Sequence, residues 1–247
     1  MASHSLRLLT YNVHRCQGID RHISPYRIAE VIVRTGSDVV ALQELDVNRA
    51  RSGRVNQAEL IAALLEMEFH FHPAWRMAEE RFGDAVLSRL PLRLVHAAQL
   101  PGHPRGWRER RGALWVEVQV GPHRVQVINT HLGLVRHERQ TQINALLGPH
   151  WLGNAHCRAP VILCGDFNAL PGSVVYQRCR DRLRDVREAL PPRRPRRTYP
   201  TRLPVATIDH VFVSPEFQVR HVEVVRTPLA RMASDHYPLL ADLSLPE

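Results

Sequence analysis

Apolar positions near the start of the chain follow two alternating patterns. Residues 6–14 and 38–45 are short apolar runs of the kind found in strands, whereas residues 25–34 and 57–67 space their apolar side chains as helices do. Ser24 and Pro25 mark the beginning of the first helix, because serine caps free backbone N–H groups and proline is tolerated in the first turn. The opening of the chain is therefore predicted as strand, helix, strand, helix.

Short strands dominate the prediction for the rest of the chain. The expected strands cover residues 69–75, 83–90, 113–120, 124–132, 161–164, 207–213, 218–226 and 239–245. One further helix is expected over residues 137–147. Segments 101–111 and 191–204 are rich in proline and arginine, which disfavours strand pairing and predicts exposed loops.

Many short strands with helices between them predict an α/β (α+β) fold of two packed sheets flanked by helices, because each sheet must bury a face. A length of 247 residues suits one domain, which we expect over residues 6–245. No apolar run is long enough to span a bilayer, so a transmembrane segment is not expected. The first residues lack the features of a signal peptide, which predicts a cytoplasmic protein, and no obligate protein partner is inferred.

Charge and cysteine content narrow the function classes only a little. The formal net charge is +9, and every basic residue other than histidine is arginine, which favours either a polyanion partner or a solvated surface with a coding bias. The cysteines lie at positions 16, 157, 164 and 179 without a CxxC pair. This spacing indicates reduced structural thiols and argues against a zinc site.

Acids, amides and histidines end several of the predicted strands. These residues are Asn12, Glu44, His131, Asp166, Asn168, Asp209, Asp235 and His236. Oxygen ligands of this kind suit a hard cation such as Mg²⁺ or Mn²⁺. The histidines add candidates for proton transfer or for stabilising a phosphate.

Six short motifs around these residues occur in a fixed order. They are Thr10-Tyr-Asn-Val13, Leu42-Gln-Glu44, Asn129-Thr-His-Leu132, Gly165-Asp-Phe-Asn168, Ile208-Asp-His-Val211 and Ser234-Asp-His236. In these motifs the sequence resembles the endonuclease/exonuclease/phosphatase superfamily, whose relatives include pancreatic deoxyribonuclease, apurinic endonucleases, neutral sphingomyelinases and inositol polyphosphate phosphatases. The resemblance extends from Leu6 to Leu245. It implies a deoxyribonuclease-like, four-layered αββα sandwich of two mixed sheets, with the motifs meeting at one edge.

The resemblance also implies a metal centre. Glu44 resembles the principal metal carboxylate, and Asn12 and Asp235 resemble residues that complete or support the metal shell. The implied cofactor is Mg²⁺ or Mn²⁺. His14 is expected to point toward this centre, because it shares a strand face with Asn12 by the two-residue period.

The hydrolytic roles follow from the same resemblance. Asp166 resembles the group that positions and deprotonates the attacking water, and Asn168 resembles an orienting group for the phosphate or nucleophile. His236 resembles the histidine on the scissile phosphate, with Asp209 as its carboxylate partner. His131 matches a position near the phosphate or the leaving group.

Some positions depart from the pattern or lie outside it. Apurinic endonucleases carry an acid at the position of His14 and tend to carry lysine at that of Asp46, which lowers the odds of a DNA-repair role. Arg89 is a further candidate for substrate binding, although a structural role is favoured. Trp107 and Arg111 lie in a predicted loop that could stack on a base or touch a lipid surface.

The sequence thus predicts a divalent-metal-dependent hydrolase of phosphoesters, with a phosphodiester as the favoured substrate and no covalent protein intermediate. A phospholipid head group or a small phosphorylated molecule is favoured over DNA or RNA. A nuclease remains the alternative, and a catalytically inactive phosphate-binding module is the alternative from another class.

Overall fold

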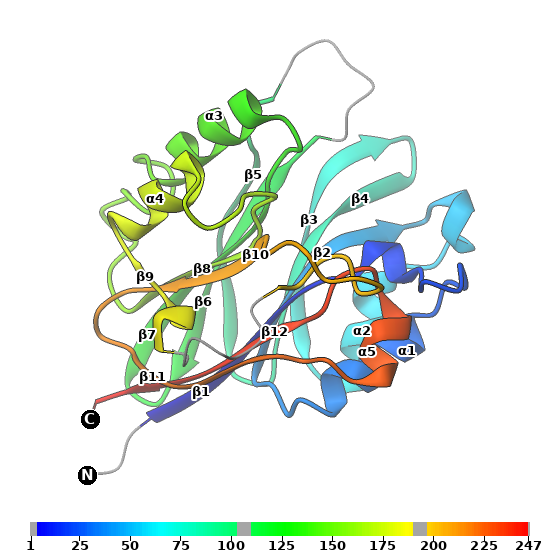
Figure 1. Ribbon diagram of the computed structural model, residues 1–247, viewed down its shortest axis with the longest axis horizontal. Helices are drawn as coiled ribbons and strands as arrows, with labels where there is room; N and C mark the ends of the chain where they lie inside the picture. Colours follow the sequence, from blue (N-terminus) through cyan, green and yellow to red (C-terminus); the bar gives the residue numbers. More distant parts are fainter. Residues whose placement is uncertain (1–3, 103–109, 190–196, 247) are drawn as a thin grey trace.

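Two six-stranded sheets form the centre of the computed structural model, which describes residues 4–102, 110–189 and 197–246 (Figure 1). The first sheet has the order β11 (Gln218–Val224), β12 (Leu239–Leu245), β1 (His4–Asn12), β2 (Val39–Val47), β4 (Glu80–Ser88), β3 (Glu68–Met77). The second has the order β5 (Leu92–Gln99), β6 (Gly112–Val120), β7 (His123–His131), β8 (Val161–Asp166), β10 (Asp209–Val213), β9 (Arg184–Asp185). Both sheets are mixed, because β1 runs parallel to β2 and β7 runs parallel to β8.

Helices cover the outer face of each sheet. The helices α1 (Pro25–Val33), α2 (Gln57–Leu65) and α5 (Pro228–Ala233) lie on the side of the first sheet. The helices α3 (Arg136–Leu146) and α4 (Val174–Arg180) lie over the second (Figure 1). Apolar side chains of α3 and α4 pack on those of β7, β8 and β10. The molecule therefore has four layers, helices, sheet, sheet and helices, which confirms the predicted fold class.

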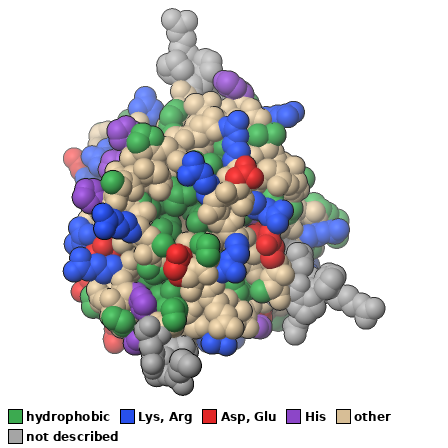
Figure 2. Space-filling model, turned by 90° about the vertical axis from the view of Figure 1, so that its left-hand side faces the viewer, with side chains coloured by type: hydrophobic (Ala, Val, Ile, Leu, Met, Phe, Trp, Pro, Cys, Tyr) green, Lys and Arg blue, Asp and Glu red, His purple; other side chains and the backbone are tan. Residues whose placement is uncertain are grey.

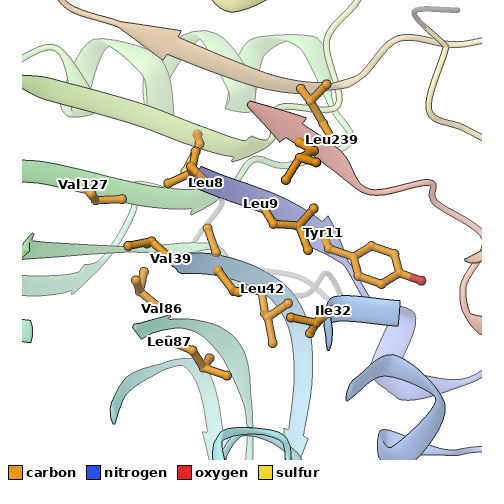
Figure 3. Close-up of a cluster of buried hydrophobic side chains, with 14 of the residues drawn as sticks. Leu8, Leu9, Tyr11, Ile32, Val39, Leu42, Val86, Leu87, Val127 and Leu239 are labelled. Atoms are coloured by element: carbon orange, nitrogen blue, oxygen red, sulfur yellow. The ribbon is translucent and has the colours of Figure 1, made fainter. Parts of the chain in front are cut away.

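The core lies on both faces of the first sheet. Residues Leu8 to Asn12 of β1 are all buried, because helices cover one face of the strand and the second sheet covers the other. Figure 3 shows this arrangement, with Leu8 between the strands and Tyr11 beside Ile32 of α1. A continuous apolar run in the sequence thus corresponds to a strand that is enclosed on both sides.

Buried amides join the two sheets close to their shared edge. Gln43 Nε2 of β2 donates to Asn129 Oδ1 of β7 at 2.7 Å and to Thr10 Oγ1 of β1 at 3.1 Å. Asn129 Nδ2 donates in turn to the carbonyl oxygens of Leu42 and Ala85, at 2.9 Å each. These bonds join the sheets where the polar strand ends meet, so three of the six motifs also hold the fold together.

Besides the short 3-10 turns, four elements were not predicted. They are the edge strands β5 and β9 and the short helices α4 and α5, whose N-caps are Ser173 and Thr227. The longest helix in the described ranges, α3, has 11 residues, and none of the described helices combines the length and apolarity that a membrane crossing requires.

Candidate active site

The polar strand ends meet at one edge of the two sheets. The register pairs His131 of β7 with Asp166 of β8, and Asp166 with Asp209 of β10. From the first sheet, Asn12 at the end of β1 reaches across to Asp166. Residues that are distant in the sequence therefore surround one small volume, as the motif order implied.

Asn12 links carboxylates of the two sheets. Its Nδ2 donates to Glu44 Oε1 and to Asp166 Oδ2, at 3.0 Å each, and its Oδ1 accepts the backbone N–H of His14 at 3.0 Å. The side-chain amide therefore directs N–H groups at both carboxylates and orients Glu44 and Asp166, and its oxygen keeps a second lone pair beside the bond to His14.

A β-bulge sets the direction of Glu44. The β2–β4 register shifts between Leu42 and Leu45, and Glu44 adopts a left-handed backbone with φ of 64°. Such a conformation is uncommon for a residue other than glycine, asparagine or aspartate. Bulges of this kind redirect a side chain at a strand end, so Glu44 faces the site directly after Gln43, which also faces the second sheet.

Asp166 is the buried carboxyl group at the centre of the site. Its Oδ1 accepts the backbone N–H of Asn168 at 2.8 Å, and its Oδ2 lies 3.4 Å from His131 Nε2 and 3.7 Å from His236 Nε2. Burial, together with the negative charge of Asp209, raises the pKa of Asp166 to about 7. The group therefore titrates near neutral pH, as a general base should.

His236 is paired with Asp209. Its Nδ1 lies 3.0 Å from Asp209 Oδ2, and both side chains are buried. Burial opposes a charge on the ring, but the carboxylates of Asp209 and Asp166 outweigh it and raise the pKa of His236 to about 10. His236 is therefore an imidazolium at neutral pH, with Nε2–H directed toward Asp166.

His131 has the opposite electrostatic setting. Arg111 Nη1 lies 3.0 Å from His131 Nδ1, and because a guanidinium only donates, Nδ1 must be the acceptor. Burial and the positive charges of Arg111 and His236 lower the pKa of His131 well below its usual value. The ring is therefore neutral with its proton on Nε2, which faces Asp166 Oδ2 at 3.4 Å.

The four candidate substrate contacts have different positions. Arg111 is buried directly before β6 and contacts His131, so the expectation of an exposed loop residue is wrong. Arg89 directly follows β4, at the end that pairs with the start of β2 and away from Glu44, and its backbone N–H donates to the carbonyl oxygen of Asp38, so the structure does not bring it to the site. Trp107 lies outside the described residues. His14 does border the site, with Nδ1 at 3.7 Å from Asp235 Oδ1.

His14 does not reach the site as part of a strand face shared with Asn12, as the two-residue period predicted. Strand β1 ends at Asn12, and His14 begins a short 3-10 turn with φ of 46°. The two-residue period of a strand therefore does not extend to His14. The side chain reaches Asp235 because the chain turns at this point.

Tyr199 belongs to the site although no motif predicted it. Its ring packs on His236 with centroids 4.7 Å apart. Burial and the carboxylates of Asp235, Asp166 and Glu44 raise the pKa of its hydroxyl group. Tyr199 lies in the segment predicted as a proline- and arginine-rich loop, and the bridge from Tyr199 to Ala206 gives this segment its order.

The state of the carboxylate and imidazole atoms in the site determines which of them could bind a cation. Within the described residues, Asp166, Asp209 and His236 offer ligand atoms within 4.8 Å of one another. However, the pairing of His236 with Asp209 keeps the ring protonated, and an imidazolium has no lone pair for a metal. Glu44 and Asp235 have no such competing cationic partner at hydrogen-bond distance among the described residues, apart from His14 at 3.7 Å from Asp235. Carboxylate oxygens there fit a hard cation.

A second polar cluster lies directly behind the site. His210 follows Asp209 on β10 and points to the other face; its Nδ1 lies 3.0 Å from Arg187 Nη1, and its Nε2 lies 2.8 Å from the carbonyl oxygen of Ala169. Arg187 also donates to the carbonyl oxygen of Asp209. Tyr176 donates to Asp185 Oδ2 at 2.9 Å. These four side chains, Tyr176, Asp185, Arg187 and His210, form what we call the support cluster.

Known proteins resemble this chain in both sequence and fold. The family model described as Endonuclease/Exonuclease/phosphatase family matches residues 9–236. Uncharacterized protein YbhP of Escherichia coli strain K12 is 26% identical over 254 residues, which cover 98% of this chain and 97% of that protein.

Solved structures agree with the fold. An endonuclease/exonuclease/phosphatase from Beutenbergia cavernae superposes with a TM-score of 0.76 and 24% identity, covering 98% of this chain and 72% of the other. The mannosyl-6-phosphatase of Bacteroides thetaiotaomicron superposes with a TM-score of 0.75 and 19% identity, covering 96% of this chain and 99% of the other. At these identities the similarity establishes the architecture and leaves the substrate open.

Proposed function

Because the chain belongs to the endonuclease/exonuclease/phosphatase family, we propose that it is a divalent-metal-dependent phosphoesterase that cleaves a phosphodiester by attack of water. The observation that carries this proposal is the electrostatic arrangement around Asp166. A buried carboxyl group with a pKa of about 7 lies between a neutral histidine and an imidazolium. A base and two N–H donors at one place suit the hydrolysis of a phosphoryl group.

The proposed cofactor is Mg²⁺ or Mn²⁺. Glu44 would be its principal ligand, Asp235 would contribute a second carboxylate, and Asn12 would keep Glu44 oriented. Such an ion supplies charge neutralisation at the phosphoryl oxygens and lowers the pKa of bound water. Oxygen-only ligands favour these hard cations over zinc.

In this proposal, different residues transfer the proton of water and stabilise the charge on the phosphoryl group. Asp166 accepts the proton of the attacking water, because a pKa near 7 leaves much of it ionised at neutral pH. His236 presents Nε2–H and a positive charge to the phosphoryl oxygens, and Asp209 keeps it protonated. His131 presents a neutral Nε2–H. Asn168 donates its side-chain N–H to the carbonyl oxygen of Leu132 and its backbone N–H to Asp166 Oδ1, which suits an orienting role.

The favoured substrates are a lipid head group or a small phosphorylated molecule. A second candidate function, a nuclease, is favoured by the net charge of +9. Figure 2 shows arginine side chains spread over the face that carries α3 and α4. A nuclease that uses these charges would lose binding steeply as salt increases, because phosphate contacts release counterions.

The test is hydrolysis of bis(4-nitrophenyl) phosphate by the purified chain with Mg²⁺ or Mn²⁺. We expect turnover that EDTA abolishes and that Asp166→Asn lowers by about a thousandfold. Glu30→Gln, which changes an exposed carboxylate on α1, serves as the matched control and should leave turnover unchanged. Turnover that survives both EDTA and Asp166→Asn would refute the proposal. Plasmid DNA, single-stranded RNA, phospholipids and a sugar phosphate in the same assay then separate the substrate classes.

A further inference from the structure

Exposed aliphatic side chains gather on three loops around the candidate active site. Leu134 and Val135 follow His131, Leu170 follows Asn168, and Leu203 and Val205 lie in the turn that Tyr199 and Ala206 close. We call these five residues the aliphatic rim. Leu134 and Leu203 are each 71% exposed, Val205 is 60% exposed and Leu170 is 53% exposed. More than half of each of these four side chains is exposed to solvent.

The topology brings these loops together. Strands β7 and β8 are adjacent and parallel, so the loops carrying Leu134 and Leu170 leave the same edge of the second sheet. The third loop begins at Tyr199, whose ring packs on His236. Each loop therefore starts within a few residues of a side chain of the site, and the rim surrounds its mouth.

Arginine side chains fix and accompany the rim. Arg139 Nη1 donates to the carbonyl oxygen of Leu134 at 2.6 Å, and Arg202 Nη2 donates to that of Ile19 at 2.8 Å. These bonds hold the loops in place with the aliphatic groups outward. Arg136 and Arg202, which are exposed, directly follow Val135 and precede Leu203. Positive charge thus lies beside the aliphatic groups.

A small cavity borders the site beside the third loop. Its volume is about 280 Å³, and its lining includes His14 and Asp235 of the site, Pro200 and Thr201 of the third loop, and Arg202, which directly precedes Leu203 of the rim. A cationic side chain next to the rim thus lines the same cavity as Asp235, one of the proposed metal ligands.

We propose that the aliphatic rim docks the chain on an anionic lipid surface, so that the substrate is an amphiphilic phosphoester presented at that surface. This deepens the proposed function by assigning its substrate class. Aliphatic groups enter the acyl boundary of a membrane while neighbouring arginines meet anionic head groups. A single-stranded nucleic acid is disfavoured, because stacking on bases needs free aromatic rings. In the described parts of these loops the aromatic residues are Phe167, which is buried, and Tyr199, which packs on His236. A protein partner is disfavoured because leucine and valine are rare among the dominant contacts of protein interfaces.

The test is flotation of the full chain with lipid vesicles in EDTA, where no hydrolysis takes place. Vesicles of phosphatidylcholine alone are compared with equal parts of phosphatidylcholine and phosphatidylglycerol. We expect binding to the anionic vesicles, and we expect Leu134→Ser with Leu203→Ser to lower the partition coefficient by at least about tenfold, since two leucine side chains leave the interface. Val33→Ser with Leu94→Ser removes two exposed apolar groups, 54% and 43% exposed, from the ends of α1 and β5 that lie away from the site, and should leave both binding and activity unchanged.

Three results would overturn the inference: no binding of the wild type to anionic vesicles, equal binding to vesicles with and without phosphatidylglycerol, or equal losses in both double variants. Thermal melting of each variant shows that it is folded. Vesicle binding without hydrolysis of the soluble ester would refute the proposed function and support the docking surface. Hydrolysis of the soluble ester without vesicle binding would do the reverse.

Discussion

Strand β10 separates two clusters built from the same kinds of side chain. Asp209 faces the candidate active site, where it meets His236, and the next residue, His210, faces the support cluster with Arg187 and Asp185. Each cluster contains a buried arginine that donates to the Nδ1 of a histidine, Arg111 to His131 and Arg187 to His210, at 3.0 Å in both cases. Composition alone does not distinguish them.

The two clusters differ in how fully their polar atoms are paired and in the pKa of their carboxyl groups. In the support cluster both ring nitrogens of His210 are bonded, and burial of Asp185 is outweighed by His210 and Arg187, which lower its pKa to about 2. In the site, burial and Asp209 raise the pKa of Asp166 to about 7. A carboxylate surrounded by sufficient positive charge stabilises the fold, whereas one placed beside another carboxylate becomes able to take up a proton.

The largest expected effect comes from changing Asp209→Asn, which removes the negative charge that sustains the imidazolium. The pKa of His236 should fall from about 10 toward its ordinary value, because the main group that raises it is gone. Activity on bis(4-nitrophenyl) phosphate should fall by about a thousandfold, and the high-pH limit of the remaining activity should move to lower pH. NMR titration of the ring and a pH–rate profile measure the two effects. An unchanged His236 titration would contradict the assigned pairing.

Changing Asp185→Asn tests the opposite cluster. The folded-state pKa of Asp185 is lowered to about 2, so its ionised form stabilises the fold above the unfolded pKa, and this contribution is lost as the pH falls through about 2. We expect the variant to lose about 2 kcal/mol of unfolding free energy at neutral pH, with the difference shrinking as the pH approaches 2. Urea unfolding at several pH values checks this. A variant that keeps full stability but loses turnover would show that the support cluster has a chemical role.

The smallest effect is expected for Arg111→Met, which keeps the apolar part of the side chain and removes its charge. The pKa of His131 should rise, because Arg111 is one of the causes that lower it, although burial still opposes protonation. We expect turnover to fall by about tenfold, since the ring loses the contact that fixes its tautomer. The measurement is the His131 titration by NMR together with kcat, and Arg111→Lys should restore part of the shift. An unchanged His131 pKa in Arg111→Met would contradict the assigned electrostatic effect of Arg111 on this histidine.

Sequence alone predicted the fold class and most strands because an enclosed strand is a continuous apolar run, and the polar residue that ends it marks an edge of the sheet. Asp166 after Val161–Cys164 is one such case, and Asn12 after Leu6–Tyr11 is another. The edge strand β5 escaped prediction because it pairs only with β6 and has a mixed pattern with a bulge. The helices α4 and α5 are too short to show a helical period, and their capping residues Ser173 and Thr227 were the available sign.

The finer structure of the site depends on contacts that no local pattern records. Arg111 meets His131 only because β6 and β7 pair, and Tyr199 meets His236 only because a loop of irregular structure folds back. The position of His14 depends on where β1 stops, and strand ends are what periodicity resolves least well. Motifs thus identified which residues assemble, and tertiary structure decided which protons they carry.

The β-bulge in β2 sets the directions of two neighbouring side chains, Gln43 and Glu44. In a regular strand Gln43 and Glu44 would face opposite layers, yet both point to the second sheet, one to Asn129 and the other toward Asn12 and His131. A single added or deleted residue between Leu42 and Leu45 would restore the regular alternation and turn one of the two toward the helices. The directions of Glu44, the acid proposed for the cation, and Gln43, the amide that joins the sheets, thus depend on the same bulge. An insertion there cannot move one of the two side chains without the other. Loop grafting on this scaffold should therefore leave residues 42–45 intact.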